Sequence, residues 1–113
     1  MKLLKEVLER LKKEKIMEPK ITEIQIIPIK PQNGLVAFAS FVLDGSLYLG
    51  SIGIVTRPQG GYRLVYPTKK VVDRNLNIFY PINREFALAI EQRVVRQFED
   101  VMTKYDRHNS FNS

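Results

Sequence analysis

The side chains of this chain with the most specific chemistry are basic, and they gather in its middle. Lysine and arginine recur at expected strand ends, in loops and at a helix entrance: Arg57, Arg63, Lys69, Lys70, Arg74 and Arg84. Exposed cations of this kind bind phosphate, and phosphate binding needs no further sequence pattern. We expect Lys69 and Lys70, in the short loop after Pro67 and Thr68, to be the main anion-binding residues. A solvated basic rim without a partner is the alternative interpretation.

The charge of the whole chain agrees with an anionic partner. Its 113 residues carry 18 Lys and Arg against 12 Asp and Glu, a net charge of +6. Residues 1–20 hold 7 basic against 4 acidic side chains, residues 21–80 hold 6 against 3, and residues 81–113 hold 5 against 5. The excess therefore lies in the first two segments. A basic balance in a small domain predicts a polyanionic partner such as nucleic acid.

Residues suited to catalysis or to metal binding are scarce. The absence of cysteine excludes a thiolate nucleophile, a disulfide and a thiolate zinc site. The single histidine, His108, lies near the end of the chain. Asp44 and Asp73 lie in turn motifs, where aspartate is favoured because it stabilises the backbone conformation of the turn. No glycine-rich phosphate loop occurs. We therefore expect a protein that is not an enzyme, with no cofactor, no metal and no small-molecule substrate.

The N-terminal residues predict neither secretion nor membrane insertion. Charge interrupts Met1–Glu6 every few positions, and no apolar run of membrane-spanning length occurs. Residues 2–18 instead predict an amphipathic helix, with Leu4, Val7, Leu8 and Leu11 on one stripe and Pro19 as its stop. Together with the lack of cysteine, this indicates a cytoplasmic protein that does not bind membranes.

From Ile21 onward the pattern is that of strands joined by short turns. Asn33-Gly34 and Asp44-Gly45 favour tight hairpins, and further reversals are expected at Gly60-Gly61 and at Asp73–Asn75. Five strands are predicted, at residues 21–30, 35–43, 46–56, 62–66 and 76–80. The expected class is α+β: an antiparallel β-meander of about five strands, a long C-terminal helix and the extra N-terminal helix.

The expected strand at residues 35–43 is apolar on both faces. Leu35, Ala37, Ala39, Phe41 and Leu43 alternate with Val36, Phe38, Ser40 and Val42. A half-exposed strand would alternate with polar residues, so both faces of this strand should be covered. One helix covers one face fully, so the other face should meet the N-terminal helix or a second subunit. A homodimer is the simpler solution.

The C-terminal helix is the clearest predicted element. Asn83 is a favourable N-cap and Glu85 places an acid in the first turn. An apolar stripe follows at helical spacing: Ala87, Ile90, Val94, Phe98, Val101 and Tyr105. Arg93 and Arg96 lie on the opposite side of this helix. We divide the chain into an N-terminal helical extension (1–19), a domain (20–105) and a flexible tail (106–113).

Segments between about residues 21 and 98 resemble the SpoVG family (stage V sporulation protein G, or septation protein SpoVG) in order and spacing. They are Ile21–Ile24, Leu35–Asp44, Ile52–Val55, Gly61–Lys70 and Tyr80–Asn83. The Pro67–Lys70 loop and the Tyr80–Asn83 junction are the most specific marks of that family. Residues 1–19 have no counterpart in its short members.

The resemblance implies an antiparallel sheet with a C-terminal helix, dimerising through the sheet, in a bacterial regulator that binds DNA and RNA. By family similarity, Lys69 and Lys70 of the loop and Arg93 and Arg96 of the helix would contact nucleic acid. Arg74 and Arg84 join these candidates on charge alone. A role in septation or sporulation does not follow from the fold.

Two functions from different classes are compatible with these observations. The first is a homodimeric DNA- or RNA-binding regulator of the SpoVG type that anchors phosphates through the basic loop and the C-terminal helix. The second is a non-catalytic protein interaction module that docks on a partner through the N-terminal amphipathic helix, with the positive charge incidental.

Overall fold

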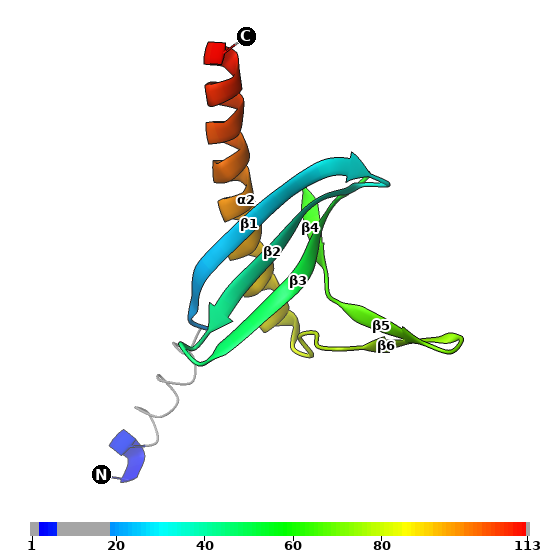
Figure 1. Ribbon diagram of the computed structural model, residues 1–113. Helices are drawn as coiled ribbons and strands as arrows, with labels where there is room; N and C mark the ends of the chain where they lie inside the picture. The colour runs from blue at the N-terminus through cyan, green and yellow to red at the C-terminus, as the bar shows by residue number, and fades with distance from the viewer. Residues whose placement is uncertain (1–2, 7–18, 113) are drawn as a thin grey trace.

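The computed structural model describes the backbone of residues 3–6 and 19–112, and the side chains of residues 3–6 and 19–105. A curved antiparallel sheet, a separate two-stranded ribbon and a long helix make up the fold (Figure 1). The elements are β1 (Ile21–Gln32), β2 (Leu35–Leu43), β3 (Leu47–Thr56), β4 (Tyr62–Val65), β5 (Thr68–Val71), β6 (Arg74–Asn77) and α2 (Arg84–Asn112). The predicted α+β class is confirmed.

The N-terminal helix predicted over residues 2–18 is described only in part. Residues 3–6 are helical, and residues 7–18 lie outside the described part of the chain. The packing of the predicted amphipathic stripe, and the partner-docking function that depends on it, therefore stay predictions.

The main sheet has the strand order β1-β2-β3-β4, with every neighbouring pair antiparallel. Its first two turns are the predicted ones: φ is 52° at Asn33 and 88° at Gly34, and 52° at Asp44 and 65° at Gly45. Positive φ at both central positions suits the right-handed twist of a hairpin, and Asn, Asp and Gly adopt it at least cost. Local turn chemistry thus sets the meander.

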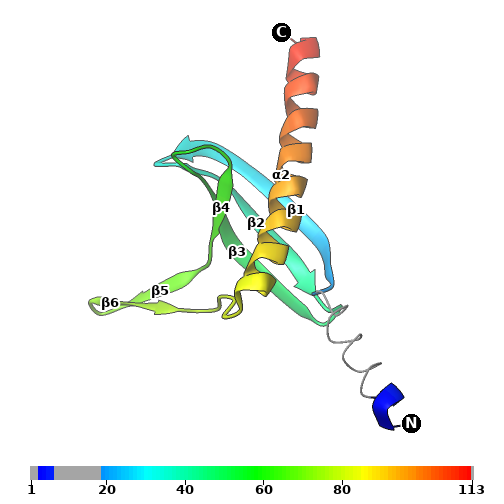
Figure 2. The ribbon, with the colours of Figure 1, turned by 180° about the vertical axis from the view of Figure 1, so that it is seen from behind.

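Helix α2 packs across one face of the main sheet and forms the core with it (Figure 2). Ile90, Val94 and Phe98, at spacings of four residues, are fully buried. Tyr62 of β4 meets Phe98 edge-on, with ring centroids 4.9 Å apart. The other buried apolar residues are Ile21, Ala37, Ala39, Phe41, Ile52 and Ile54. The predicted helical stripe is confirmed at its centre.

Two bulges bend the main sheet around α2. One extra residue of β1 lies between the pairs Thr22↔Val42 and Gln25↔Ser40, and φ at Glu23 is 52°. A second register shift in the pairing of β2 with β3 lies between Ala39 and Phe41, where φ at Ser51 of β3 is 60°. Bulges sharpen local twist and bend a strand. Both lie in the C-terminal half of β2 and contribute to the curvature of the sheet (Figure 1).

The junction before α2 caps the helix as the sequence predicts. The side-chain oxygen Oδ1 of Asn83 accepts a hydrogen bond from the backbone N–H of Phe86 at 3.0 Å, and its carbonyl accepts one from Ala87 at 2.9 Å. This satisfies donors that the first turn of a helix leaves free. The helix then runs beyond Tyr105 to Asn112, through residues predicted as a tail. The side chains after Tyr105, that of His108 included, lie outside the described set.

The face of the main sheet opposite α2 carries an apolar row. Cross-strand pairing places Ile27, Phe38, Gly53 and Val65 side by side across the four strands. Ile27 is 63% exposed, Phe38 38% and Val65 40%. No element of the described chain covers this row, although the sequence predicts that both faces of β2 are buried.

The structure corrects the prediction for the region between Pro67 and Ile78. Lys69 and Lys70 lie in strand β5 and not in a loop, and the strand predicted at residues 76–80 lies at Arg74–Asn77. It pairs only with β5, so the ribbon is a second sheet and not the fifth strand of the meander. The reversal is at Val72 and Asp73, one position before the predicted turn.

Candidate nucleic-acid interface

The β5–β6 ribbon projects away from the main sheet and from α2 (Figures 1 and 2). The backbone N–H of Ile78 donates to the carbonyl of Pro67 at 3.1 Å and closes the base of the ribbon. Next to this bond in sequence, on the side of the body of the protein, Tyr66 and Phe79 pack edge to face with ring centroids 5.9 Å apart. Every residue of β5 and β6 is exposed. The ribbon is therefore a protruding arm fixed at its base.

The two lysines that the sequence places side by side point to opposite faces of this ribbon. Successive residues of a strand alternate between faces, and cross-strand partners share a face. The pairs Thr68↔Asn77 and Lys70↔Asn75 form one face, and the pairs Lys69↔Leu76 and Val71↔Arg74 form the other. The first face is wholly polar, whereas the second mixes two cations with two apolar side chains.

The ribbon is positively charged and its cations are unpaired among the described residues. Lys69, Lys70 and Arg74 against Asp73 give residues 68–77 a net charge of +2. Within the described side chains, no ion pair or hydrogen bond engages any of the three cations. Val72 at the tip is 89% exposed and has a φ of 59°, a conformation that strains a β-branched residue.

The predicted residues of α2 lie apart from the ribbon cations. Arg84 is the first residue of the helix, and Arg93 and Arg96 follow about 13 Å and about 18 Å along its axis at 1.5 Å per residue. One guanidinium nitrogen of Arg93, Nη2, donates to the backbone carbonyl of Ile21 at 3.0 Å. Arg93 thus ties α2 to the start of β1, a role that sequence reasoning missed because the two residues are distant in the chain.

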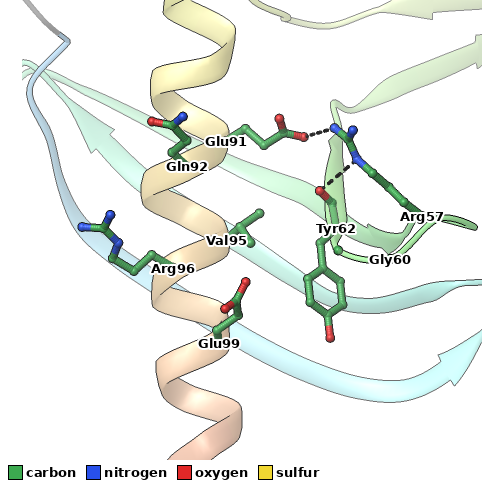
Figure 3. A pocket seen from close by; sticks show the side chains of 9 residues that line it. Arg57, Gly60, Tyr62, Glu91, Gln92, Val95, Arg96 and Glu99 are labelled. Carbon is green, nitrogen blue, oxygen red and sulfur yellow. Dashed lines mark hydrogen bonds and ion pairs between the residues drawn. The ribbon is translucent and has the colours of Figure 1, made fainter.

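Arg96 lines a groove between α2 and the turn that joins β3 to β4. The groove has a volume of about 620 Å³ and is lined by Arg57, Gly60, Gly61, Tyr62, Glu91, Gln92, Val95, Arg96 and Glu99. Figure 3 shows Arg57 reaching across it to Glu91, with Nη2 and Oε1 2.9 Å apart, while its Nε donates to the carbonyl of Tyr62 at 3.1 Å. The lining contains two arginines and two glutamates, so this groove lacks the net positive charge of the ribbon.

Near the start of α2, a small cavity of about 180 Å³ contains an unpaired hydroxyl. The phenolic oxygen of Tyr66 is buried and has no hydrogen-bond partner among the described residues. Burial, reinforced by the negative charge of Glu91, raises the pKa of Tyr66 to about 12. The phenol therefore stays protonated in the folded chain at pH values where an ordinary tyrosine ionises.

We expect Tyr66→Phe to stabilise the fold at neutral pH by about 1 kcal/mol, because it removes a buried polar group without a partner. Above the ordinary tyrosine pKa of 10, the unfolded chain loses this proton before the folded chain does. The free energy of unfolding then falls as the pH rises from about 10 to about 12. The Tyr66→Phe variant should lack this part of the decrease.

Urea unfolding between pH 7 and pH 11 measures the free energy of unfolding of both proteins. Tyr80→Phe, at an exposed tyrosine, is the control. Equal decreases with pH in the two variants would contradict the raised pKa of Tyr66.

Metal and membrane features are not found among the residues described. No group of three or more His, Cys, Asp and Glu side chains in that part of the chain is placed to hold a metal ion. Over the same residues, no helix combines the length and apolarity needed to cross a bilayer.

Comparison with known proteins decides the family. The family model described as SpoVG matches residues 19–100, which include the main sheet, the ribbon and the packed half of α2. The chain belongs to the SpoVG family. Membership makes it a SpoVG-type regulatory protein, related to the proteins of sporulation and septation, in a family that is generally not enzymatic. A search of curated proteins finds no match.

Proposed function

We propose that this SpoVG protein is a homodimeric DNA- or RNA-binding regulator that acts without catalysis. The observation that carries the proposal is the protruding β5–β6 ribbon with its three cations, which no described side chain pairs. A cationic arm that stands clear of the body can follow a phosphate backbone without a clash elsewhere. Phosphate contacts supply most of the affinity for nucleic acid and depend little on sequence.

Arg84, Arg93 and Arg96 extend the proposed contact surface along α2. Arg93 keeps guanidinium donors beyond the one bonded to Ile21, since the group carries five. Arg84 begins the helix, where free backbone N–H groups add a positive potential. The ribbon and the helix together offer cations at two separate places, which suits a partner that is long compared with the protein.

A second copy of the chain is the proposed cover of the open sheet face. Ile27, Phe38 and Val65 form an exposed row with Gly53 between them, and Tyr48, farther along β3 and paired with Val42, is 67% exposed. Monomeric proteins seldom leave contiguous apolar patches on their surface. A dimer packed through these faces would carry two ribbons related by a two-fold axis. The nucleic-acid sites of symmetric dimers consist of two repeated half-sites.

The Lys69→Ala/Lys70→Ala variant tests phosphate anchoring. We expect weaker binding to all nucleic-acid sequences, because fewer phosphates are neutralised. On duplex DNA, the slope of log K against log salt should become shallower by about 0.9 for each phosphate that the variant no longer neutralises. Fluorescence anisotropy with labelled duplex and single-stranded oligonucleotides across a salt series gives both quantities.

The matched control is Lys30→Ala/Lys104→Ala, which removes the same charge from residues outside the candidate set. Its salt slope should stay close to that of the unmodified protein. Equal slopes for the ribbon variant and the unmodified protein would remove the lysines from the interface. A protein that binds no nucleic acid but retains a stable protein partner would replace this function with the interaction module.

A further inference from the structure

The polar face of the β5–β6 ribbon has the properties of a surface that reads bases. It consists of Thr68, Lys70, Asn75 and Asn77, and all four side chains are exposed. None of these side chains makes a hydrogen bond within the described part of the chain. Their donors and acceptors are therefore free for a ligand, whereas the surface that Lys69 shares with Leu76 and Val71 offers fewer.

We propose that this polar face enters the major groove of duplex DNA, with Asn75 and Asn77 contacting base edges. The inference rests on the proposed function and deepens it, because phosphate anchoring alone carries no sequence information. An asparagine amide donates to N7 and accepts from N6–H of adenine in a bidentate pair. Adenine at two nearby positions is the preference that follows.

The dimensions of the ribbon select this groove. Its strands lie about 4.8 Å apart, and the major groove of B-DNA, about 12 Å wide, admits a two-stranded ribbon. Four residues of a strand span about 13 Å, which corresponds to about four base-pair steps of 3.4 Å. The major groove of an RNA helix is too narrow for side chains to read. The partner is therefore duplex DNA.

The rest of the ribbon supports this orientation. Lys70 lies opposite Asn75 on the same face, and its long stem allows the ammonium to reach the phosphates of the groove wall. The opposite face places Val71 and Leu76, 42% and 49% exposed, beside Lys69 and Arg74. Those two apolar side chains cannot form hydrogen bonds with the donors and acceptors of the base edges. If this face entered the groove, the base edges would lose their hydrogen bonds to water and gain none in exchange.

The test compares the unmodified protein with Asn75→Ala/Asn77→Ala on a duplex selected from random DNA pools and on a scrambled duplex. The double variant should bind the selected duplex at least about tenfold more weakly and the scrambled duplex equally well, with an unchanged salt slope. A second selected duplex carries 7-deazaadenine, which lacks the N7 acceptor, in place of its adenines. The unmodified protein should bind this duplex about tenfold more weakly than the original one, whereas the affinity of the double variant should change little. Gln59→Ala, in the exposed turn before β4, is the matched control.

The outcomes separate this inference from the proposed function. Retained preference for the selected duplex in the double variant overturns base reading by the ribbon while nucleic-acid binding stands. Selection of RNA or single strands alone overturns it as well. An unmodified protein that binds none of the pools overturns the proposed function itself, and the inference falls with it.

Discussion

Phe38→Asp is expected to convert the proposed homodimer into folded monomers. Phe38 lies at the centre of the open face of the main sheet, paired with Ile27 of β1 and with Gly53 of β3. In a dimer closed through this face, each carboxylate would be buried against apolar side chains without a partner, at a cost of several kcal/mol. We expect the dissociation constant to rise at least about a hundredfold, since every 1.4 kcal/mol is a factor of ten.

Light scattering coupled to size exclusion measures the mass of both proteins at micromolar concentration. Gln59→Asp, which adds the same charge in an exposed turn, should leave the dimer intact. A monomeric unmodified protein, or a Phe38→Asp variant that keeps the dimer mass, would rule out this interface. Circular dichroism of the variant establishes that the lower mass does not come from unfolding.

Phe41→Ala is expected to lower the free energy of unfolding by about 3–5 kcal/mol. Phe41 is fully buried in β2, on the face that packs against α2, and lies beside the bulges at Glu23 and Ser51. Its removal leaves a cavity that the paired strands on either side cannot easily close. A decrease of this size is a large share of the roughly 5–15 kcal/mol that stabilises a typical domain.

Urea unfolding followed by circular dichroism measures this decrease. Phe38→Ala is the matched control, because it truncates the same residue type in the same strand on the open face. Both substitutions are measured in the background of a second open-face substitution, Ile27→Asp, which is expected to disfavour the proposed dimer. In that background Phe38→Ala should lower the free energy of unfolding clearly less than Phe41→Ala. Equal costs would place Phe41 and Phe38 in equivalent environments, contrary to the burial of one and the 38% exposure of the other.

The main sheet and the helix follow from local signals in the sequence. Asn33-Gly34 and Asp44-Gly45 predict their turns because few other residues adopt positive φ at low cost. Asn83 predicts the first residue of α2 because its side chain bonds the backbone three residues on. Core positions such as Phe41 and Val94 follow from alternation in the strand and from helical spacing.

The ribbon could not be predicted in the same way. All residues of β5 and β6 are exposed, so the sequence has no alternation of buried and exposed positions to mark the strands. Its turn is formed by Val72 and Asp73 and not by an Asn-Gly pair, so the turn residues at Asp73–Asn75 indicate a reversal but place it one position too late. The separation of Lys69 from Lys70 onto two faces follows only from the register. The bond from Arg93 to Ile21 depends on packing between distant segments.

The isolation of the ribbon has a consequence for how this protein can evolve. One hydrogen bond between Ile78 and Pro67 and one aromatic contact between Tyr66 and Phe79 join it to the body, and none of its residues is buried. Mutations within it therefore change little of the free energy of folding. Selection can alter the arm while the core that carries it stays the same. Descendants of one ancestral fold can thus differ in the surface of the arm, at the ten positions 68–77, while they keep the same core.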